Sequence, residues 1–493
     1  MTKKIGANIL EAAALYALFL LVYAAVLRFI FPGYLDPFWP AHPDLYVPVA
    51  MANWPEGLRP YFSYPRFVGQ VFFWFVGHLG TRGAMAAVLM VVALNFTLIA
   101  MIARRVSNID ATWRFFAAAA LFAYMLAAHP YQYQMSIWDA FAQLSLLLIL
   151  IALVLRMAGA PLVACGVIVL LAFLAKETFI LSAGLMAFAW FSVQRTRSAL
   201  WPLVIVGVAA MLAIVIEKNL SSPFTNGDHP GGPYQLVMTL ASVSSQWFQY
   251  IGEGINWLGL LAIIAAAIFA AIRFGVRSRE FIWAVTLPIA GLLALLPNSL
   301  LPNHHFAGYS WNGAYLIYAP VIAFASIAGR GAIALALCAA VAGLCSPALS
   351  ASVFAQQQYI IENQKTQRNL LRELTYSAKR LPRGERVLIT GVDVRFSIFS
   401  NATAVRSLGA PEGTQFFVVA TGVNPVPAPD VQNRAQGGLV QVIGPDDAKS
   451  KKFDQEWSFR ADGSLVKQGA INFEVQQPTS CKVLHKWEPT TRT

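Results

Sequence analysis

Residues 140 to 193 read AFAQLSLLLILIALVLRMAGAPLVACGVIVLLAFLAKETFILSAGLMAFAWFSV. Apolar runs dominate this stretch, and it is broken in only two places, around Arg156 and at Lys176-Glu177. Runs of this kind cross a hydrocarbon core of about 30 Å when neighbouring residues complete them or the bilayer thins locally. The stretch therefore predicts three consecutive transmembrane helices, at 137 to 156, 160 to 175 and 178 to 193.

The same pattern extends over most of the chain. Further apolar runs predict spans at 9 to 31, 83 to 103, 114 to 128, 201 to 217, 255 to 273, 281 to 298, 313 to 328 and 332 to 350. The sequence is 57% hydrophobic and only 12% charged, and its mean hydropathy is +0.56. Soluble proteins carry about 25% charged residues. We expect a membrane all-α fold of about eleven transmembrane helices over residues 1 to 354.

Lys and Arg residues set the predicted orientation, because short cytoplasmic loops are rich in them. Lys3 and Lys4 precede the first span, which is too long for a cleaved signal peptide and reads as a signal anchor. Every second loop after it is basic: Arg104 and Arg105, Arg156, Arg195 and Arg197, Arg273 to Arg279, and Arg330. This pattern explains the net charge of +12 better than nucleic-acid binding does. It predicts a multi-pass protein of the cytoplasmic (inner) membrane.

With eleven spans the tail, residues 355 to 493, lies outside the cell membrane, in the periplasm of a Gram-negative cell. A polar helical run at 356 to 380 and short strands at 386 to 390, 415 to 420, 439 to 443 and 481 to 487 predict a small soluble α/β domain. The outer side also carries the long loop 32 to 82, in which the apolar stretch 67 to 79 is too short to span and suits the membrane surface.

Ionisable residues at membrane depth are costly and usually line a cavity or a site. Here they gather on the predicted outer side: Asp36, Asp44, Glu56, Arg59, Arg66, His129, Asp139, Lys176, Glu177, Glu217, Lys218, His304 and His305.

The order of these features resembles the GT-C superfamily, whose members include protein O-mannosyltransferases and aminoarabinose transferases. The resemblance rests on Pro43-Asp44-Leu45-Tyr46, then Tyr61-Phe-Ser-Tyr-Pro-Arg66, then His129-Pro-Tyr-Gln-Tyr-Gln134, Trp138-Asp139 and Leu174-Ala-Lys-Glu-Thr178. It covers about the first 190 residues well. The chain departs from the family where Asp44 has no acidic neighbour, where Pro65-Arg66 inverts the usual order, and where the late loop has His304-His305 instead of an Arg-Tyr pair.

The resemblance implies an inverting glycosyltransferase that moves a monosaccharide from polyprenyl phosphate to an extracytoplasmic glycan, lipopolysaccharide, lipid or protein. The acceptor hydroxyl then needs a base, for which we expect Asp44; capping of a surface helix is the alternative role. The leaving phosphate needs cations, so we expect Lys176, Arg66, His304 and His305 to bind it. Tyr46 and Arg59 complete the predicted substrate-binding set. For Lys176 the alternatives are an interfacial lysine that snorkels outward and a salt bridge with Glu177. For Arg66 the alternative is anchoring to lipid headgroups.

Other residues of the outer side suit structural support. Asp139 lies where an acid caps a helix, Glu177 suits orienting Lys176, and His129 ends a helix before Pro130. We expect no cofactor and no metal, because the acids of the first loop are separated, although some family members hold a divalent cation.

Two other classes fit part of the pattern. A transporter or lipid flippase is usually built from repeats and carries midplane charges, neither of which the sequence contains. A non-catalytic assembly partner with the same fold would tolerate Asp44→Ala, whereas an enzyme would not.

Overall fold

The computed structural model describes residues 2–29, 67–77, 79–106, 108–109, 113–128, 140–194, 200–220, 237–254, 257–302, 307–328, 369, 372–374, 376–391, 411, 413–419, 440–443, 445–460 and 464–469. These residues belong to two compact units. The first contains the described helices up to residue 328, and the second contains a small sheet formed after residue 385.

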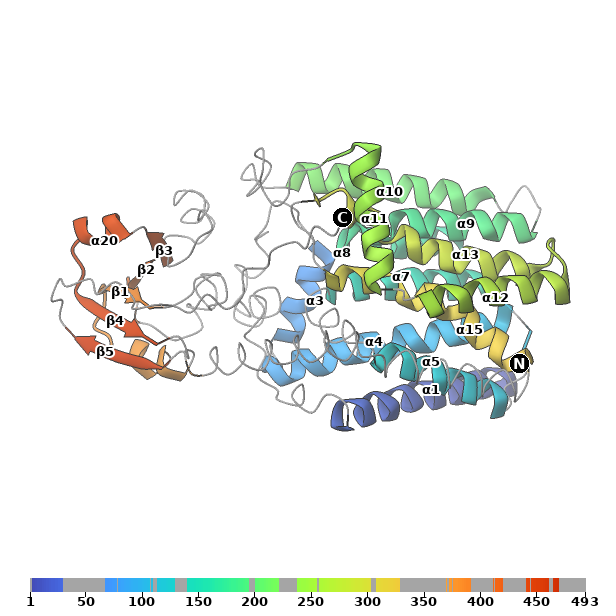
Figure 1. The fold of residues 1–493 in the computed structure, drawn as a ribbon, viewed down its shortest axis with the longest axis horizontal. Helices are drawn as coiled ribbons and strands as arrows, with labels where there is room; N and C mark the ends of the chain where they lie inside the picture. Colours follow the sequence, from blue (N-terminus) through green and yellow to red (C-terminus); the bar gives the residue numbers. More distant parts are fainter. Residues whose placement is uncertain are drawn as a thin grey trace. The chain divides into compact units, whose positions relative to one another are not determined.

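The first unit is a bundle of helices whose axes are roughly aligned, whichever way the chain runs along them (Figure 1). Its long members are α1 (Thr2–Phe29), α4 (Gly80–Val106), α5 (Trp113–Ala128), α7 (Ala140–Met157), α8 (Leu162–Ala175), α9 (Ile180–Gln194), α10 (Trp201–Leu220), α12 (Trp257–Phe274), α13 (Arg279–Leu293) and α15 (Ala314–Ala328). Helix α3 (Phe67–Gly77) covers the stretch predicted as a surface helix. The predicted spans from 9 to 328 therefore fall on helices, and the one at 332 to 350 lies outside the described residues.

Four of the described helices contain a segment long and apolar enough to cross a membrane: Asn8–Val26, Ala86–Val106, Ala140–Met157 and Arg279–Ser299. Shorter apolar helices lie at Trp113–Ala127, Leu162–Ala175, Trp201–Ile216 and Ile263–Phe274. Large apolar side chains such as Leu10, Val163, Met211 and Ile272 are exposed on the outside of the bundle, as expected of a surface that meets lipid. The unit has the helices of a membrane protein, whereas the total of eleven spans stays a prediction.

Aromatic rings join α1, α4 and α5 in the interior. The Phe96 ring of α4 stacks on Phe19 of α1, with centroids 4.9 Å apart, and on Phe122 of α5 at 5.6 Å. All three side chains are fully buried. Because offset aromatic pairs contribute beyond their buried area, this stack fixes the packing of the N-terminal helix.

A buried ion pair also holds α1 against α4. Glu11 forms a salt bridge with Arg104, and the Arg104 Nε donates to the Ile109 carbonyl at 3.0 Å. The Glu11 side chain is only 8% exposed. Glu11 lies near the start of α1 and Arg104 near the end of α4, so the two helices run in opposite directions. Opposite directions are expected of consecutive spans, here 9 to 31 and 83 to 103.

We expect Glu11→Ala to lower the thermal stability of the detergent-solubilised protein, because it leaves the half-buried Arg104 guanidinium without this carboxylate. Breaking a fully buried pair from one side costs about 3–5 kcal/mol in other proteins, and the partial exposure of Arg104 makes the expected loss smaller. The double variant Glu11→Leu with Arg104→Met should recover part of the loss in a thermal unfolding assay. A Glu11→Ala protein that unfolds at the wild-type temperature would show that the pair contributes nothing.

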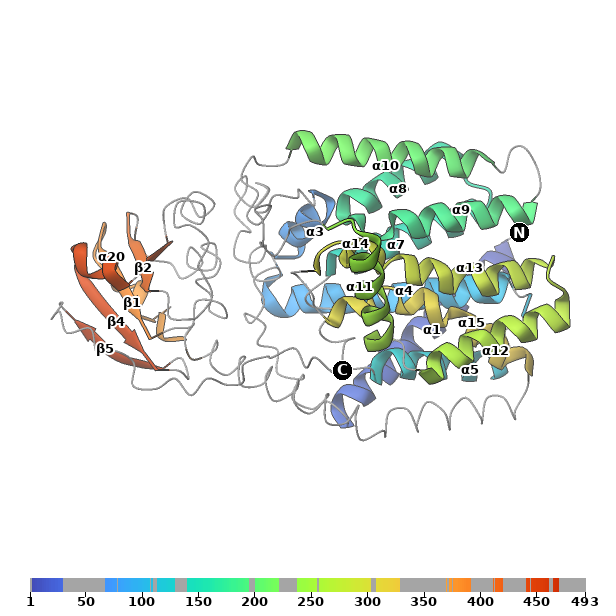
Figure 2. The same cartoon turned by 45° about the horizontal axis from the view of Figure 1, so that its top comes forward.

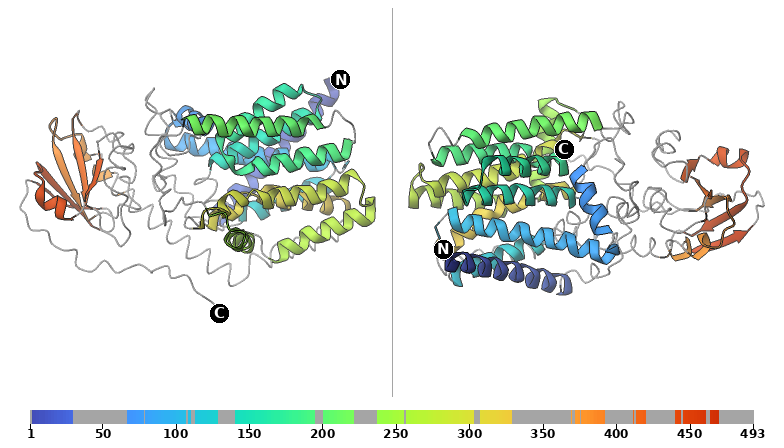
Figure 3. Two further views of the ribbon diagram at one scale, coloured as in Figure 1. Left: turned by 90° about the horizontal axis from the view of Figure 1, so that it is seen from above. Right: turned by 180° about the vertical axis from the view of Figure 1, so that it is seen from behind.

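Helix α11 (Leu240–Gly254) lies between the predicted spans 201 to 217 and 255 to 273, where the sequence pattern predicts no helix. It runs across the bundle instead of along it (Figures 1 and 3). Its Trp247 indole donates to the Leu292 carbonyl of α13 at 2.9 Å, and Tyr250 is fully buried, while Phe248 is 64% exposed. The helix was missed because its apolar residues are spaced among Ser and Gln, so no continuous apolar run marks it.

The second unit contains one five-stranded sheet, in the order β3-β2-β1-β4-β5 (Figure 2). The strands are β1 (Arg386–Thr390), β2 (Gln415–Val419), β3 (Val440–Ile443), β4 (Gln455–Phe459) and β5 (Leu465–Gly469), and α20 (Pro445–Ser450) follows β3. Strands β1 to β4 are parallel, and β5 is antiparallel to β4. The first three strands were predicted, whereas β4 and β5 were missed because their polar residues hide the apolar positions. The strand predicted at 481 to 487 lies outside the described residues.

Candidate functional site

The break between α8 and α9 positions Lys176. Helix α8 ends at Ala175, Lys176 adopts an extended backbone (φ −166°, ψ 139°), and the 3-10 helix η3 (Glu177–Phe179) then leads directly into α9. The Lys176 amide donates to the Ala172 carbonyl at 3.1 Å, and Ser145 Oγ of α7 donates to the Lys176 carbonyl at 3.0 Å. Both the amide and the carbonyl of Lys176 are therefore hydrogen-bonded. These bonds fix the backbone of the turn and with it the direction of the lysine side chain.

The Lys176 side chain is buried instead of reaching water. The residue is 2% exposed, and its Nζ lies 5.0 Å from the centroid of the Tyr309 ring, in the 3-10 helix η6 (Ala307–Trp311). An ammonium facing an aromatic ring is attracted by the ring's negative face. Because a buried cation has lost most of its hydration, an anion that reaches it gains more than it would from an exposed lysine. Lys176, the residue for which a phosphate contact is predicted, is thus a desolvated cation.

Buried polar side chains also lie on the segments around this turn. Helix α14 (Leu296–Ser299) contacts both η3 and α11, and α11 contacts η6. Thr178 Oγ1, Asn298 Nδ2 and Ser310 Oγ are buried and have no hydrogen-bond partner within the part of the chain that the structure describes. Buried donors of this kind call for water or a ligand. Three buried polar groups without partners thus lie on the segments that surround the Lys176 turn.

The sequence predicts Lys176 and Glu177 as site residues, but it does not predict Tyr309, Asn298 or Ser310. Glu177 follows the lysine in η3 and is half-buried. Its predicted role in orienting Lys176 stays a prediction. A usable signal for Asn298 was present, because Pro297-Asn298-Ser299 interrupts an apolar run at the end of a predicted span. Nothing in the sequence links Tyr309 to Lys176, since they lie far apart in the chain.

The remaining predicted site residues lie outside the described residues. They are Asp44, Tyr46, Arg59, Arg66, His129, Asp139, His304 and His305. Their roles stay predictions. Among the described residues no group of three or more His, Cys, Asp or Glu side chains could hold a metal ion. The acids of the first loop lie outside the described residues, so the expected independence of metal also stays a prediction.

Two glycines place η6 and α15 against α13. A Cβ built at Gly313, which directly precedes α15, would overlap the carbonyl group of Gly291 in α13. A Cβ built at Gly291 would lie 2.6 Å from the Gly313 oxygen and 2.9 Å from the Ile317 nitrogen. Small residues allow this close approach of backbones in membrane helices. Since Tyr309 lies just before Gly313, the glycine pair also fixes the position of the ring that faces Lys176.

We expect Gly313→Ala to push α15 and η6 away from α13 and to lower both thermal stability and any activity that depends on the Lys176 site. Gly207→Ala in α10 is the matched control, because a Cβ there meets nothing within 4 Å. Thermal unfolding of the two purified variants measures the difference. Equal stability of both variants would contradict the assigned close approach.

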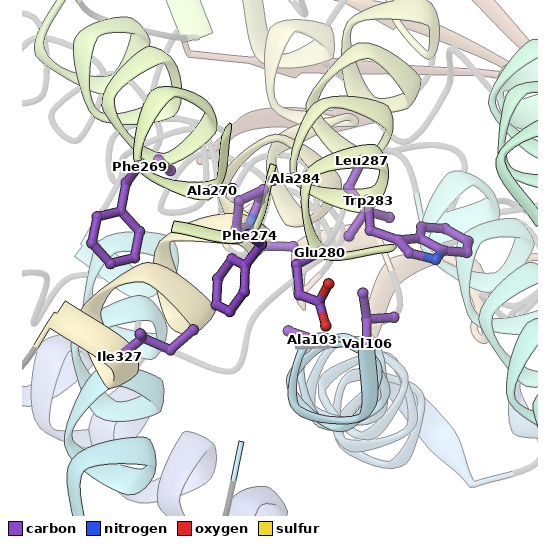
Figure 4. Close-up of a pocket in the computed structure, with 13 residues that line it drawn as sticks. Ala103, Val106, Phe269, Ala270, Phe274, Glu280, Trp283, Ala284, Leu287 and Ile327 are labelled. Atoms are coloured by element: carbon purple, nitrogen blue, oxygen red, sulfur yellow. The ribbon is translucent and has the colours of Figure 1, made fainter. Parts of the chain in front are cut away.

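A pocket elsewhere in the bundle does not contain the predicted residues. It is lined by apolar side chains of α4, α12, α13 and α15, among them Ala103, Phe274 and Trp283, with Glu280 as an acid on its wall (Figure 4). Glu280 belongs to the first turn of α13, whereas Ser182 of α9, just after the Lys176 turn, donates to the Ala290 carbonyl near the other end of α13 at 2.6 Å. The pocket and the Lys176 turn therefore lie toward opposite ends of α13.

The three comparisons with known proteins give no relative from which a function could be taken. No family model, no curated protein and no solved structure matches this chain.

Proposed function

We propose that the protein is a GT-C-like glycosyltransferase, which transfers a monosaccharide from a polyprenyl-phosphate carrier to an extracytoplasmic acceptor. The observation that carries the proposal is the buried ammonium of Lys176, in a helix break that is lined by Tyr309 and by polar side chains. Breaking the glycosidic bond builds negative charge on the carrier phosphate. A desolvated cation placed at that phosphate stabilises the charge more in the transition state than in the ground state.

The proposed reaction needs two functions, stabilisation of the leaving phosphate and deprotonation of the acceptor hydroxyl. Lys176 receives the departing lipid phosphate, with Arg66, His304 and His305 as further proposed ligands. Asp44 takes the proton from the acceptor hydroxyl as that oxygen attacks the anomeric carbon, so the sugar's configuration inverts in one displacement. The resemblance of the first 190 residues to the GT-C superfamily supports this assignment. The soluble tail is proposed to lie on the same side of the membrane as the reaction.

The purified protein in liposomes, supplied with polyprenyl-phosphate monosaccharides and a cell-envelope extract, tests the proposal. We expect free polyprenyl phosphate to appear together with a sugar-bearing acceptor. A donor analogue with a carbon in place of the bridging oxygen should inhibit without turnover. A flippase would move that analogue across the bilayer, so translocation without any sugar transfer would contradict the proposal.

A further inference from the structure

The soluble α/β unit carries most of its described cations at one edge of its sheet. Strands β1 and β4 are parallel neighbours, so the segments that precede them meet at the same edge. The contact is direct: the Arg386 amide donates to Asp454 Oδ2 at 2.8 Å, and the Asp454 amide donates to the Arg386 carbonyl at 2.9 Å. We name this the amino edge. Its cations are Lys379, Arg380, Arg383, Arg386, Lys449, Lys451 and Lys452.

Acidic residues offset only part of this charge. Glu385 and Asp454 are the acids in the segments 376–386 and 449–454, and both already accept hydrogen bonds, Glu385 from the Gln455 amide group at 2.6 Å and Asp454 from the Arg386 amide. Asp446 and Asp447 begin α20, which follows the carboxyl end of β3, so they start from the opposite edge. The amino edge is therefore a concentrated positive surface.

The packing holds part of this charge in place. The Arg386 guanidinium lies 5.0 Å from the Phe417 ring and 5.7 Å from the Phe453 ring, and Lys451 Nζ lies 5.6 Å from Phe417. Lys379, Arg383 and Lys452 stand exposed around them. A cluster pre-organised on a rigid strand end loses little conformational entropy when it binds a flat array of anions.

One aromatic residue favours a membrane as the source of those anions. Tyr376 is 58% exposed and stacks against Arg380, whose Cζ lies 3.7 Å from the ring centroid. An exposed Tyr beside an Arg is typical of the headgroup layer of a bilayer, where the ring meets the acyl boundary and the cation meets phosphate. The bilayer is also the polyanion to which the apolar helices of the same chain tether this unit, at high effective concentration.

We propose that the amino edge docks on anionic phospholipid headgroups of the membrane that holds the chain. The proposal is independent of the proposed glycosyl transfer, because it concerns only the soluble unit and the bilayer. It gives the basic cluster and the exposed Tyr376 a shared role that neither the fold of the sheet nor the Lys176 site requires.

Hydrogen exchange of the full-length protein in nanodiscs tests it. In discs containing phosphatidylglycerol, the peptides covering 376–386 and 449–454 should exchange at least about threefold more slowly than in phosphatidylcholine discs, and about 0.5 M salt should abolish the difference. The triple variant Lys379→Gln, Arg383→Gln and Lys452→Gln should lose the protection. Arg460→Gln is the matched control, since Arg460 is an exposed cation that follows the carboxyl end of β4.

Equal exchange in both kinds of disc would overturn the proposal, and so would protection that the triple variant retains. Protection by soluble dextran sulfate without any effect of phosphatidylglycerol would assign the edge to a soluble polyanion and overturn it as well. Unchanged exchange of β5 in the triple variant shows that the fold is intact, so loss of protection reports the removed charges.

Discussion

Lys176→Met should lower kcat/KM for sugar transfer from polyprenyl phosphate by about 10²–10³-fold, the loss that follows removal of one electrostatic contact to a developing oxyanion. Methionine fills a similar volume in the buried site but carries no charge. Lys176→Arg should retain part of the activity because it keeps the positive charge. It should not retain all of it, because the buried site has little room for the larger guanidinium. The measurement is a rate assay over a range of donor concentrations.

Stability separates this role from a structural one. Methionine fills about the volume of the lysine side chain, so Lys176→Met should stay folded and unfold near the wild-type temperature. Arg277→Met, at an exposed cation between α12 and α13, is the matched control and should leave the rate unchanged. Near wild-type transfer by Lys176→Met would remove the lysine from the mechanism. Outward snorkelling, one of the alternative roles of Lys176, does not fit its 2% exposure, whereas the salt bridge with Glu177 stays a prediction.

Asp44→Asn should reduce kcat by about 10²–10⁴-fold, the range over which a positioned general base accelerates proton transfer. Asparagine caps a helix about as well as aspartate does but does not take up the acceptor's proton. Binding of polyprenyl phosphate should persist, because the base acts on the acceptor and not on the carrier. The measurement pairs the transfer rate with lipid binding in a thermal-shift assay.

The comparison with Asp44→Ala distinguishes the two roles considered for Asp44. A base predicts that the Asn and Ala variants are equally inactive. A capping role predicts that Asn is active and that Ala alone is impaired. Full activity of both variants would favour a non-catalytic assembly partner over an enzyme.

The helices of the bundle could be predicted from sequence because each is an apolar run bounded by charge or by Gly and Pro, as in the stretch from Ala140 to Val193. Helix α11 could not, since its face toward η6 and α14 is recognised only when those segments are in place. The same limit applies to the α/β unit. Strand β1 reads as a continuous buried run, whereas the buried residues of β4, Trp457 and Phe459, alternate with polar residues.

The site shows a similar division. Lys176 could be selected because a cation between two apolar runs is costly unless it has a role. Its burial, and the choice of Tyr309 as the ring that faces it, depend on the close approach of Gly313 to Gly291, which is a tertiary contact between distant parts of the chain. Local sequence contains no trace of that contact.

A structure of the full-length protein with bound polyprenyl phosphate would show whether Lys176 binds the carrier. We expect a phosphate oxygen about 3 Å from the Lys176 Nζ, the distance of a charge-assisted hydrogen bond, with the polyprenyl chain leaving toward the exposed apolar surface of the bundle. A phosphate bound at the Glu280 end of α13, or anywhere beyond the reach of Lys176, would contradict it.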